Sequence, residues 1–212
     1  MALGAKKLAP QTSLGTLVLA AQWADLLWPI LLLAGIERVQ ISPGVTVASP
    51  LEFTHYPISH SLLAIVLWGA LVGLTYAWLR RSRAAAWLVG ALVVSHWVLD
   101  LLVHRPDLPL YPGGPRVGLG LWNVPAATYL LEAAFLLLGL LLYLRTTAAR
   151  DRVGRLALWS FIVVLVLAYV ASELGPPPPA TRSLAIFALT AWLFPLWGYW
   201  IDRHRSVRTA GA

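Results

Sequence analysis

The sequence lacks cysteine entirely, because none occurs among its 212 residues. Disulfide bonds and thiolate metal sites are therefore excluded, and the redox compartment is left open. Charged residues are also scarce, since Asp, Glu, Lys and Arg together make up 12% of the chain, compared with roughly 25% in soluble domains. Hydrophobic residues make up 59% of the chain. This balance excludes an ordinary soluble domain and indicates an integral membrane protein.

The apolar residues are arranged in long runs separated by charged or Pro/Gly-rich segments. A transmembrane helix needs ~20 apolar residues to cross ~30 Å of hydrocarbon, and each run is about that long. The first run has no small-residue cleavage site after it, so we expect a retained helix and not a signal peptide. We predict an all-α polytopic membrane protein with one helical domain over residues 1–212. Its six predicted helices span 14–36, 59–80, 84–104, 124–145, 156–174 and 182–202.

Three prolines bear on these predicted helices. Pro125 lies in the first turn of the fourth helix, where the missing N–H does no harm. Pro29 and Pro195 lie inside the first and sixth helices, where proline removes a backbone hydrogen bond and clashes with the preceding turn. We therefore expect a kink at each, and Pro29 should also free the backbone carbonyl of Asp25.

Basic residues are distributed unevenly between the predicted loops. Twelve of the 16 Lys and Arg residues flank one set of helix ends, and four lie on the other side. By the positive-inside rule, both termini are predicted to be cytoplasmic. The twelve are Lys6, Lys7, Arg80, Arg81, Arg83, Arg145, Arg150, Arg152, Arg155, Arg203, Arg205 and Arg208, and the four are Arg38, Arg105, Arg116 and Arg182.

The net charge of +7 raises the question of a nucleic-acid partner. Because the cations are spread over membrane-flanking loops, we expect them to contact anionic lipid headgroups, and we predict no nucleic-acid binding. The opposite loops differ in kind, since 37–58, 105–123 and "SELGPPPPATRS" are long or rich in Pro, Gly and aromatic residues. Elaborate loops on one face indicate that the functional side points away from the cytoplasm.

Five ionisable side chains fall within or at the ends of the predicted spans: Asp25, His60, His96, Asp100 and Glu132. A charge at the bilayer centre costs about 2.5–3.5 kcal/mol on insertion scales, so such groups are usually paired and functional. Counted along straight helices, all five lie in the outer half of the membrane, on four different helices. We predict that they line one cavity open to the extracytoplasmic side.

The third predicted helix carries the densest pattern. His96 and Asp100 are four residues apart, so their side chains share one face, and His104 follows on that face, rotated further round. Imidazole and carboxylate groups at this spacing can bind one divalent ion, as in the helical H-x-x-x-H zinc motif. His60 is a candidate for a further nitrogen ligand. The donor set favours zinc, with iron or manganese as alternatives.

The same side chains have a simpler interpretation. A His or Asp in a membrane helix often makes structural hydrogen bonds to a backbone carbonyl or a serine. Ser59 and Ser61 flank His60, and Ser95 precedes His96, so each histidine has such a partner nearby. For single residues the two interpretations are evenly matched, whereas for the whole set we favour a shared functional site.

Four segments resemble a known family: "ADLLWPILLLAGIE", "HYPISHSL" (55–62), "SHWVLDLLVHRPDLPLY" (95–111) and "GLGLWN". "HYPISHSL" is similar to the H-R-x-x-[ST]-H-S segment, and "SHWVLD" to the H-x-x-x-D helix, of a LexA-binding-associated group of bacterial inner-membrane proteins described as metal-dependent hydrolases. The likeness covers about residues 24 to 132. It implies a multi-pass protein of the bacterial inner membrane with a divalent metal.

Carried over residue by residue, the resemblance implies that His55, His60, His96 and Asp100 are metal ligands. Asp25 would take the place of an acidic pair, P-D-x-D, that the family has near its N-terminus. The chain departs from the family in two respects. "WADLLWP" holds one Asp without a second carboxylate, and Tyr56 replaces the Arg of the His-Arg motif.

The segment "HRPDLPLYPGGPRVGLGLWN" combines prolines, glycines and a charged pair. Glycine permits tight turns and proline fixes them, so we expect an ordered loop. Arg105 and Asp107 are candidate substrate-binding residues, because a guanidinium clamps phosphate or carboxylate groups. The equally weighted alternative is a folded lid held by its own Arg–Asp pair.

Three functions remain open from the sequence. The one we favour is a metal-dependent membrane hydrolase acting on an amphipathic, lipid-like substrate, with Asp25 or Glu132 as general base. The second is an ion- or proton-handling transporter, against which no ionisable group is found in the inner halves of the helices. The third is a non-catalytic subunit of a larger membrane complex. The oligomeric state is left open.

Overall fold

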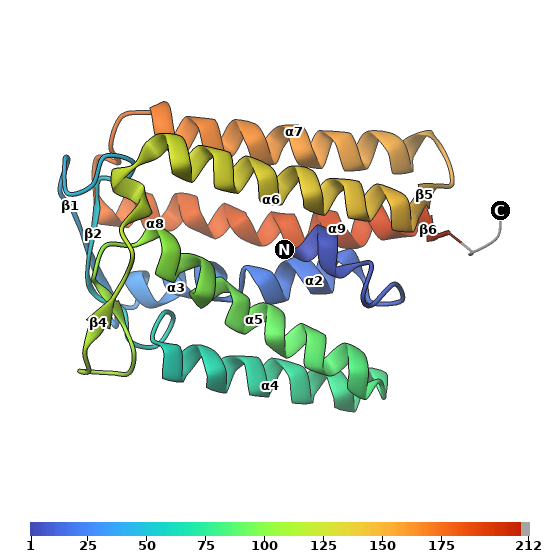
Figure 1. The fold of residues 1–212 in the computed structure, drawn as a ribbon, viewed down its shortest axis with the longest axis horizontal. Coiled ribbons are helices and arrows are strands. Elements are labelled where there is room, and N and C mark those ends of the chain that lie inside the picture. The colour runs from blue at the N-terminus through green and yellow to red at the C-terminus, as the bar shows by residue number, and fades with distance from the viewer. Residues whose placement is uncertain (209–212) are drawn as a thin grey trace.

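Long apolar helices dominate the computed structural model, which describes residues 1–208 (Figure 1). Five segments in this range are long and apolar enough to cross a membrane, and a bent pair of shorter helices gives a sixth. The prediction of a helical protein with about six spans is confirmed. Four spans are single helices: α4 (Leu62–Arg80), α5 (Arg83–Val103), α6 (Pro125–Thr146) and α7 (Arg152–Leu174). The fifth, Thr181–Arg203, combines α8 (Thr181–Ala188), the 3-10 turn η2 (Leu189–Trp192) and α9 (Leu193–Arg203).

The first span is broken at Gln22 into α2 (Leu14–Ala21) and α3 (Trp23–Leu33), whose axes differ by 57°. The kink predicted at Pro29 stays a prediction, since α3 continues through Pro29 and the 57° bend lies before it. At the break, α3 opens with the hydrogen bond from Leu26 N to Gln22 O, and the carbonyl of Ala21 accepts a bond from the His96 ring. A tertiary contact from another helix, which local sequence does not reveal, sets the position of the bend.

Proline and capping residues explain the other differences from the predicted boundaries. Pro195 lies in the first turn of α9, and the distortion precedes it as the 3-10 turn η2. α4 begins at Leu62, later than predicted, because the Ser61 hydroxyl accepts a hydrogen bond from Ala64 N and caps the helix. α7 begins at Arg152, earlier than predicted, because the Asp151 carboxylate caps Gly154 N in the same way.

Short elements mark the two ends of the helical body. The hairpin of β1 (Arg38–Ile41) and β2 (Leu51–His55) and the pair β3 (Leu108–Pro109) and β4 (Arg116–Val117) lie at one end, followed by the 3-10 turn η1 (Leu121–Asn123). The strands β5 (Thr147–Ala149) and β6 (Arg205–Val207) pair at the other end, where α6 and α9 finish and α7 begins (Figure 1). The N-terminal α1 (Ala2–Ala5) packs against α6. The predicted outer loops therefore form the β1–β4 end.

The α4–α5 hairpin depends on small residues. A Cβ atom placed on Gly69 would lie 2.8 Å from the carbonyl oxygen of Gly90, and one on Gly73 would lie 3.0 Å from that of Ala86. Such contacts let the two backbones approach closely, as small residues commonly do between membrane helices. α5 in turn packs against α2 and α3. This packing fixes the face of α5 that carries His96 and Asp100.

Candidate metal centre

Four ionisable side chains from three parts of the chain meet near the β1–β4 end. Asp25 lies in the first turn of α3, just after the break at Gln22. His60 lies in the turn before α4, and its backbone N–H donates to the backbone carbonyl of Tyr56. His96 and Asp100 lie one turn apart on α5, in the C-terminal half of the helix. The predicted i, i+4 pair therefore shares a site with groups supplied by α3 and by the loop before α4.

The side-chain atoms of this cluster surround a common point. The Nε2 atoms of His60 and His96 each lie 3.6 Å from Asp25 Oδ1. The Asp100 Oδ2 atom lies 3.9 Å from His60 Nε2 and 3.4 Å from His96 Nε2. Around a tetrahedral ion with bonds of about 2.1 Å, neighbouring ligand atoms are about 3.4 Å apart. The observed separations are those of a metal site more closely than of direct hydrogen bonds.

Each imidazole ring is oriented by a hydrogen bond on its other nitrogen. His96 Nδ1 lies 3.1 Å from the carbonyl oxygen of Ala21, which can only accept, so Nδ1 carries the proton. His60 Nδ1 lies 2.6 Å from the Ser59 hydroxyl oxygen. That hydroxyl donates to Glu37 Oε2 at 2.6 Å, so it accepts from His60. In both neutral rings Nε2 is then an unprotonated acceptor facing the carboxylates.

The donor set fits a divalent cation. With neutral rings, the two imidazole nitrogens and two carboxylate oxygens are all acceptors, and a bound cation would balance the two negative charges. Asp100 Oδ2 is buried and makes no hydrogen bond within residues 1–208. Asp25, His60 and His96 also satisfy the distance requirement for a shared ion. Neutral imidazole with carboxylate suits zinc, iron or manganese.

Two cavities meet at this cluster. The larger, of about 770 Å³, is lined by Asp25, His60 and Asp100, by the loop of the β1–β2 hairpin and by the proline segment 176–179. The smaller, of about 360 Å³, lies between α2, α5, α6 and α7 and is lined by His96, Asp100 and mainly apolar side chains. Asp100 borders both. The cluster is therefore reached from the loop end and also from a largely apolar space within the helices.

Glu132 on α6 lines the smaller cavity together with His96 and Asp100. Its Oε2 atom is buried and has no hydrogen-bond partner in the described part of the chain. It therefore shares a cavity with His96 and Asp100, whereas Asp25 and His60 line the larger cavity, so the five side chains divide between two cavities and do not line a single one as predicted. Asp25 differs from the other members in exposure, because 45% of its side chain is accessible, compared with 15% for Asp100 and 5% for His60.

The structure places two of the predicted metal ligands away from the cluster. His55 ends β2, opposite Arg38, and is exposed. His104 is buried, but its Nδ1 atom bonds Asp107 at 2.9 Å and its ring lies against Trp122, with centroids 4.3 Å apart. The ligand role predicted for these two histidines has no counterpart in the geometry of the cluster.

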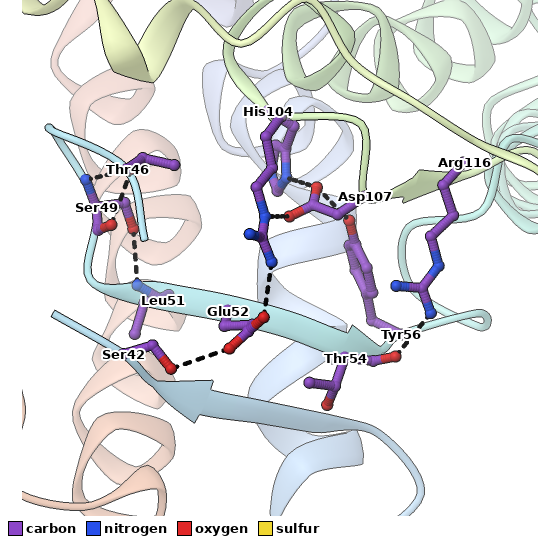
Figure 2. A network of polar contacts seen from close by, with 11 residues as sticks. Ser42, Thr46, Ser49, Leu51, Glu52, Thr54, Tyr56, His104, Asp107 and Arg116 are labelled. Atoms are coloured by element: carbon purple, nitrogen blue, oxygen red, sulfur yellow. Dashed lines mark hydrogen bonds and ion pairs between the residues drawn. The ribbon is translucent and has the colours of Figure 1, made fainter. Parts of the chain in front are cut away.

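Arg105 and Asp107 belong to a polar network that joins the 104–117 loop to the β1–β2 hairpin (Figure 2). Asp107 accepts hydrogen bonds from Tyr56 at 3.2 Å, His104 at 2.9 Å and Arg105 at 3.1 Å. Arg105 also pairs with Glu52 at 2.9 Å. Both predicted substrate-binding side chains are thus engaged within the chain, as in the lid alternative. Their contact with a substrate stays a prediction.

The network shifts the pKa values of its members. Burial alone would raise the pKa of Asp107, but the His104 hydrogen bond and the Arg105 pair lower it below its ordinary value. The Arg105 hydrogen bond, with a smaller contribution from Ser42, also lowers the pKa of Glu52. Burial and the negative charge of Asp107 raise the pKa of Tyr56, so its hydroxyl stays protonated and donates. Tyr56, which replaces the arginine of the family motif, thus anchors the loop.

Glu37 and Ser59 are site residues that the sequence analysis did not identify as such. Glu37 is 1% exposed and lies immediately before β1, and Ser59 is fully buried. In the sequence, Glu37 is visible only as an acidic residue at the end of the first span, and Ser59 only as a serine adjacent to His60. Their contact cannot be predicted from these positions, because the two residues are 22 positions apart in the chain.

Fold and site together define a polytopic helical membrane protein with a His/carboxylate cluster near one membrane face. The family model for the YdjM inner membrane protein matches residues 1–175, and the chain belongs to this family. The match includes all four cluster residues and confirms the resemblance to a bacterial inner-membrane family. No curated protein and no solved structure matches the chain. The chain is accordingly a multi-pass protein of the inner membrane.

Proposed function

We propose that this protein is a metal-dependent hydrolase of the inner membrane that acts on an amphipathic, lipid-like substrate. The observation that carries the proposal is that the Nε2 atoms of His60 and His96 each lie 3.4–3.9 Å from Asp25 Oδ1 and from Asp100 Oδ2. With neutral imidazole rings all four atoms accept, and each of the four residues lines at least one of two cavities. A purely structural network would pair donors with acceptors at hydrogen-bond distance.

His60, His96 and Asp100 would hold a divalent ion, preferably zinc, with iron or manganese as alternatives. The ion would lower the pKa of a bound water toward ~7 and polarise an ester or phosphoester oxygen. Asp25 Oδ1 also lies within reach of the ion, but its exposure to the larger cavity suits a proton acceptor. Glu132, in the smaller cavity, would be the alternative acceptor of the proton that the bound water loses.

The cavities favour an amphipathic substrate. The larger is lined by loop residues, aromatic rings and Glu173, and can receive a polar headgroup. The smaller is lined by apolar residues such as Leu99, Phe135 and Leu165, and can receive the adjoining part of an acyl chain. Their volumes, about 770 and 360 Å³, are within the range of ligand sites. A membrane lipid or its phosphoester is the partner with this division of polarity.

The proposed orientation places the cluster on the extracytoplasmic side. The basic ends of α4, α6 and α9 gather at the β5–β6 end, whereas the cluster lies toward the β1–β4 end (Figure 1). With the positive-inside rule, both termini are cytoplasmic. The substrate would then enter from the outer leaflet.

Asp25→Asn tests the proposal against a matched control, His55→Asn, which changes an exposed histidine outside the cluster. Purified, zinc-loaded protein is placed in vesicles that contain phospholipids, and phosphate or headgroup release is measured. We expect turnover by the unmodified protein, a 10²–10⁴-fold loss in Asp25→Asn with zinc retained, and an unchanged rate in His55→Asn. Absence of hydrolysis by the zinc-loaded, unmodified protein would contradict a hydrolase.

A transporter for divalent ions is the second candidate, and the broken first span favours it. Discontinuous helices commonly form the ion sites of transporters, and the break at Gln22 lies beside Asp25 and His96. The same vesicles discriminate between the two candidates. Zinc uptake into the lumen without lipid hydrolysis would favour transport.

A further inference from the structure

Glu37 is buried beside the cluster yet contributes no atom to it. Its Oε1 atom accepts hydrogen bonds from the backbone N–H of Ile58 at 2.8 Å and of Ser59 at 2.9 Å. Its Oε2 atom accepts from the Ser59 hydroxyl at 2.6 Å, and that hydroxyl lies 2.6 Å from His60 Nδ1. Glu37, Ser59 and His60 are exposed by 1%, 0% and 4%. A continuous, solvent-shielded chain of hydrogen bonds thus ends on the imidazole of His60.

The direction of each bond in this chain follows from the donors available. A carboxylate can only accept, so the single proton of the Ser59 hydroxyl lies toward Glu37. The hydroxyl oxygen then accepts from His60, and the proton of the neutral ring lies on Nδ1. Nε2 keeps its lone pair, and it is the atom that faces Asp25 and Asp100. The carboxylate of Glu37 therefore determines, through Ser59, which nitrogen of His60 is able to bind a cation.

We propose that Glu37 and Ser59 are positioning residues that hold His60 in its Nδ1–H tautomer and so prepare Nε2 as a metal ligand. This inference rests on the proposed metal site, and it extends the site to the β1–β2 hairpin, because Glu37 directly precedes β1. Partners that orient a metal-bound histidine typically change metal affinity 10–100-fold when they are substituted.

The hydrogen-bond relay from Glu37 through Ser59 to His60 predicts that the conservative substitution Glu37→Gln reverses the tautomer of His60. In Glu37→Gln, the amide oxygen can keep the two backbone N–H bonds, and the amide nitrogen then faces the Ser59 hydroxyl as a donor. The hydroxyl then accepts from the amide, and within this chain of bonds His60 Nδ1 is the acceptor available to its own proton. The ring proton moves to Nε2, where it blocks metal binding. Ser59→Ala removes the hydrogen bond that favours the Nδ1–H tautomer of His60, so it leaves both tautomers of the ring accessible.

The test combines the ring tautomer with zinc affinity. The ¹⁵N spectrum of the metal-free, full-length protein, with histidine labelled and His60 assigned by substitution, reports which ring nitrogen is protonated. Competition with a zinc chelator gives the Kd. We expect Nδ1–H in the unmodified protein and Nε2–H in Glu37→Gln. The Kd should rise 10–100-fold in Glu37→Gln and less in Ser59→Ala.

Glu52→Gln is the matched control, because Glu52 lies on the same hairpin but bonds Ser42 and Arg105 instead of the relay. It should change neither the tautomer nor the Kd. A merely structural role for Glu37 predicts that Ser59→Ala weakens zinc binding at least as much as Glu37→Gln. A loss of zinc affinity in Ser59→Ala as large as that in Glu37→Gln would overturn the relay, and so would an Nε2–H tautomer of His60 in the unmodified protein. If the unmodified protein binds no zinc, the proposed function fails, and the tautomer measurement alone decides the relay.

Discussion

Two histidines present the same atom, Nε2, to the same pair of carboxylates, and single hydrogen bonds explain why. His96 is fixed by a backbone carbonyl, which has no alternative to accepting. His60 is fixed by a hydroxyl, which could either donate or accept, and its direction is set by Glu37. The first orientation depends on the packing of α5 against the end of α2. The second depends on a side chain and is therefore the more sensitive to substitution.

Asp107 shows the other use of buried charge in this protein, which is to anchor a loop. Its three hydrogen-bond donors come from the residues at the start of its loop and from Tyr56. Because its pKa is lowered in the folded protein, its contribution to stability is present above the ordinary Asp pKa, near 3.8, and is lost as the pH falls through the folded value.

We therefore expect Asp107→Asn to lower the free energy of unfolding by about 2–4 kcal/mol at pH 7, since a buried charged hydrogen-bond partner is removed. The difference from the unmodified protein should shrink below about pH 4, where Asp107 also becomes neutral. Thermal unfolding in detergent at both pH values measures it. Glu52→Gln, at the half-buried pair with Arg105 in the same network, serves as the comparison and should have a smaller effect. An equal difference at both pH values would mean that the charge of Asp107 is not the cause.

Among the elements, the α4–α5 hairpin is the one that connects packing to the site. α4 begins directly after His60, and α5 carries His96 and Asp100. The separation of the two helices is fixed by glycines, with the nearest approach between Gly69 and Gly90. The distance between His60 and His96 is thus set partly by the contact at Gly90, which lies between one and two turns before His96 on α5.

Gly69→Leu should force α4 and α5 apart, because the new side chain meets the backbone oxygen of Gly90. We expect a loss of roughly 1–3 kcal/mol in the free energy of unfolding, the usual cost of overpacking, together with weaker zinc binding. Ala70→Leu, on the adjacent exposed face, is the control and should change neither. Thermal unfolding and zinc titration measure both effects. Unchanged zinc affinity in Gly69→Leu would separate the hairpin packing from the site.

The sequence predicted those features that depend on local periodicity. Apolar runs give the spans, and the i, i+4 spacing places His96 and Asp100 on one face. The same spacing includes His104, which caps α5 and lines the larger cavity with Asp100, but its Nδ1 atom bonds Asp107, and its role as a ligand stays a prediction. The bend at Gln22 and the Glu37–Ser59 pair depend on contacts between distant segments. Such contacts leave no periodic signal in a single sequence.

For the molecule as a whole, the orientation in the membrane is the feature that decides where a substrate would enter. The absence of cysteine makes the orientation directly testable, because a single introduced cysteine is the only thiol. Val47, 69% exposed, lies in the β1–β2 loop, and Leu8, 76% exposed, lies between α1 and α2. Lys6, near Leu8, pairs with Asp202 at the opposite end of the helices from the hairpin.

A membrane-impermeant maleimide applied to intact spheroplasts should label Val47→Cys at once. Leu8→Cys should be labelled only after the membrane is made permeable, because the positive-inside rule places the N-terminus in the cytoplasm. Labelling of both variants in permeabilised cells controls for accessibility. The reverse pattern would place the cluster on the cytoplasmic side and would contradict the proposed entry of substrate from the outer leaflet.

The most direct measurement of the central claim is the metal content of the purified protein. The measurement compares three proteins purified in detergent: the unmodified protein, His96→Ala and the control His55→Ala. Each is exposed to zinc, iron and manganese and freed of excess ion, and its bound metal is measured by elemental mass spectrometry. We predict about one divalent ion per chain in the unmodified protein and in His55→Ala, and none in His96→Ala. No bound metal in the unmodified protein, or the same content in His96→Ala, would contradict a metal centre at this cluster.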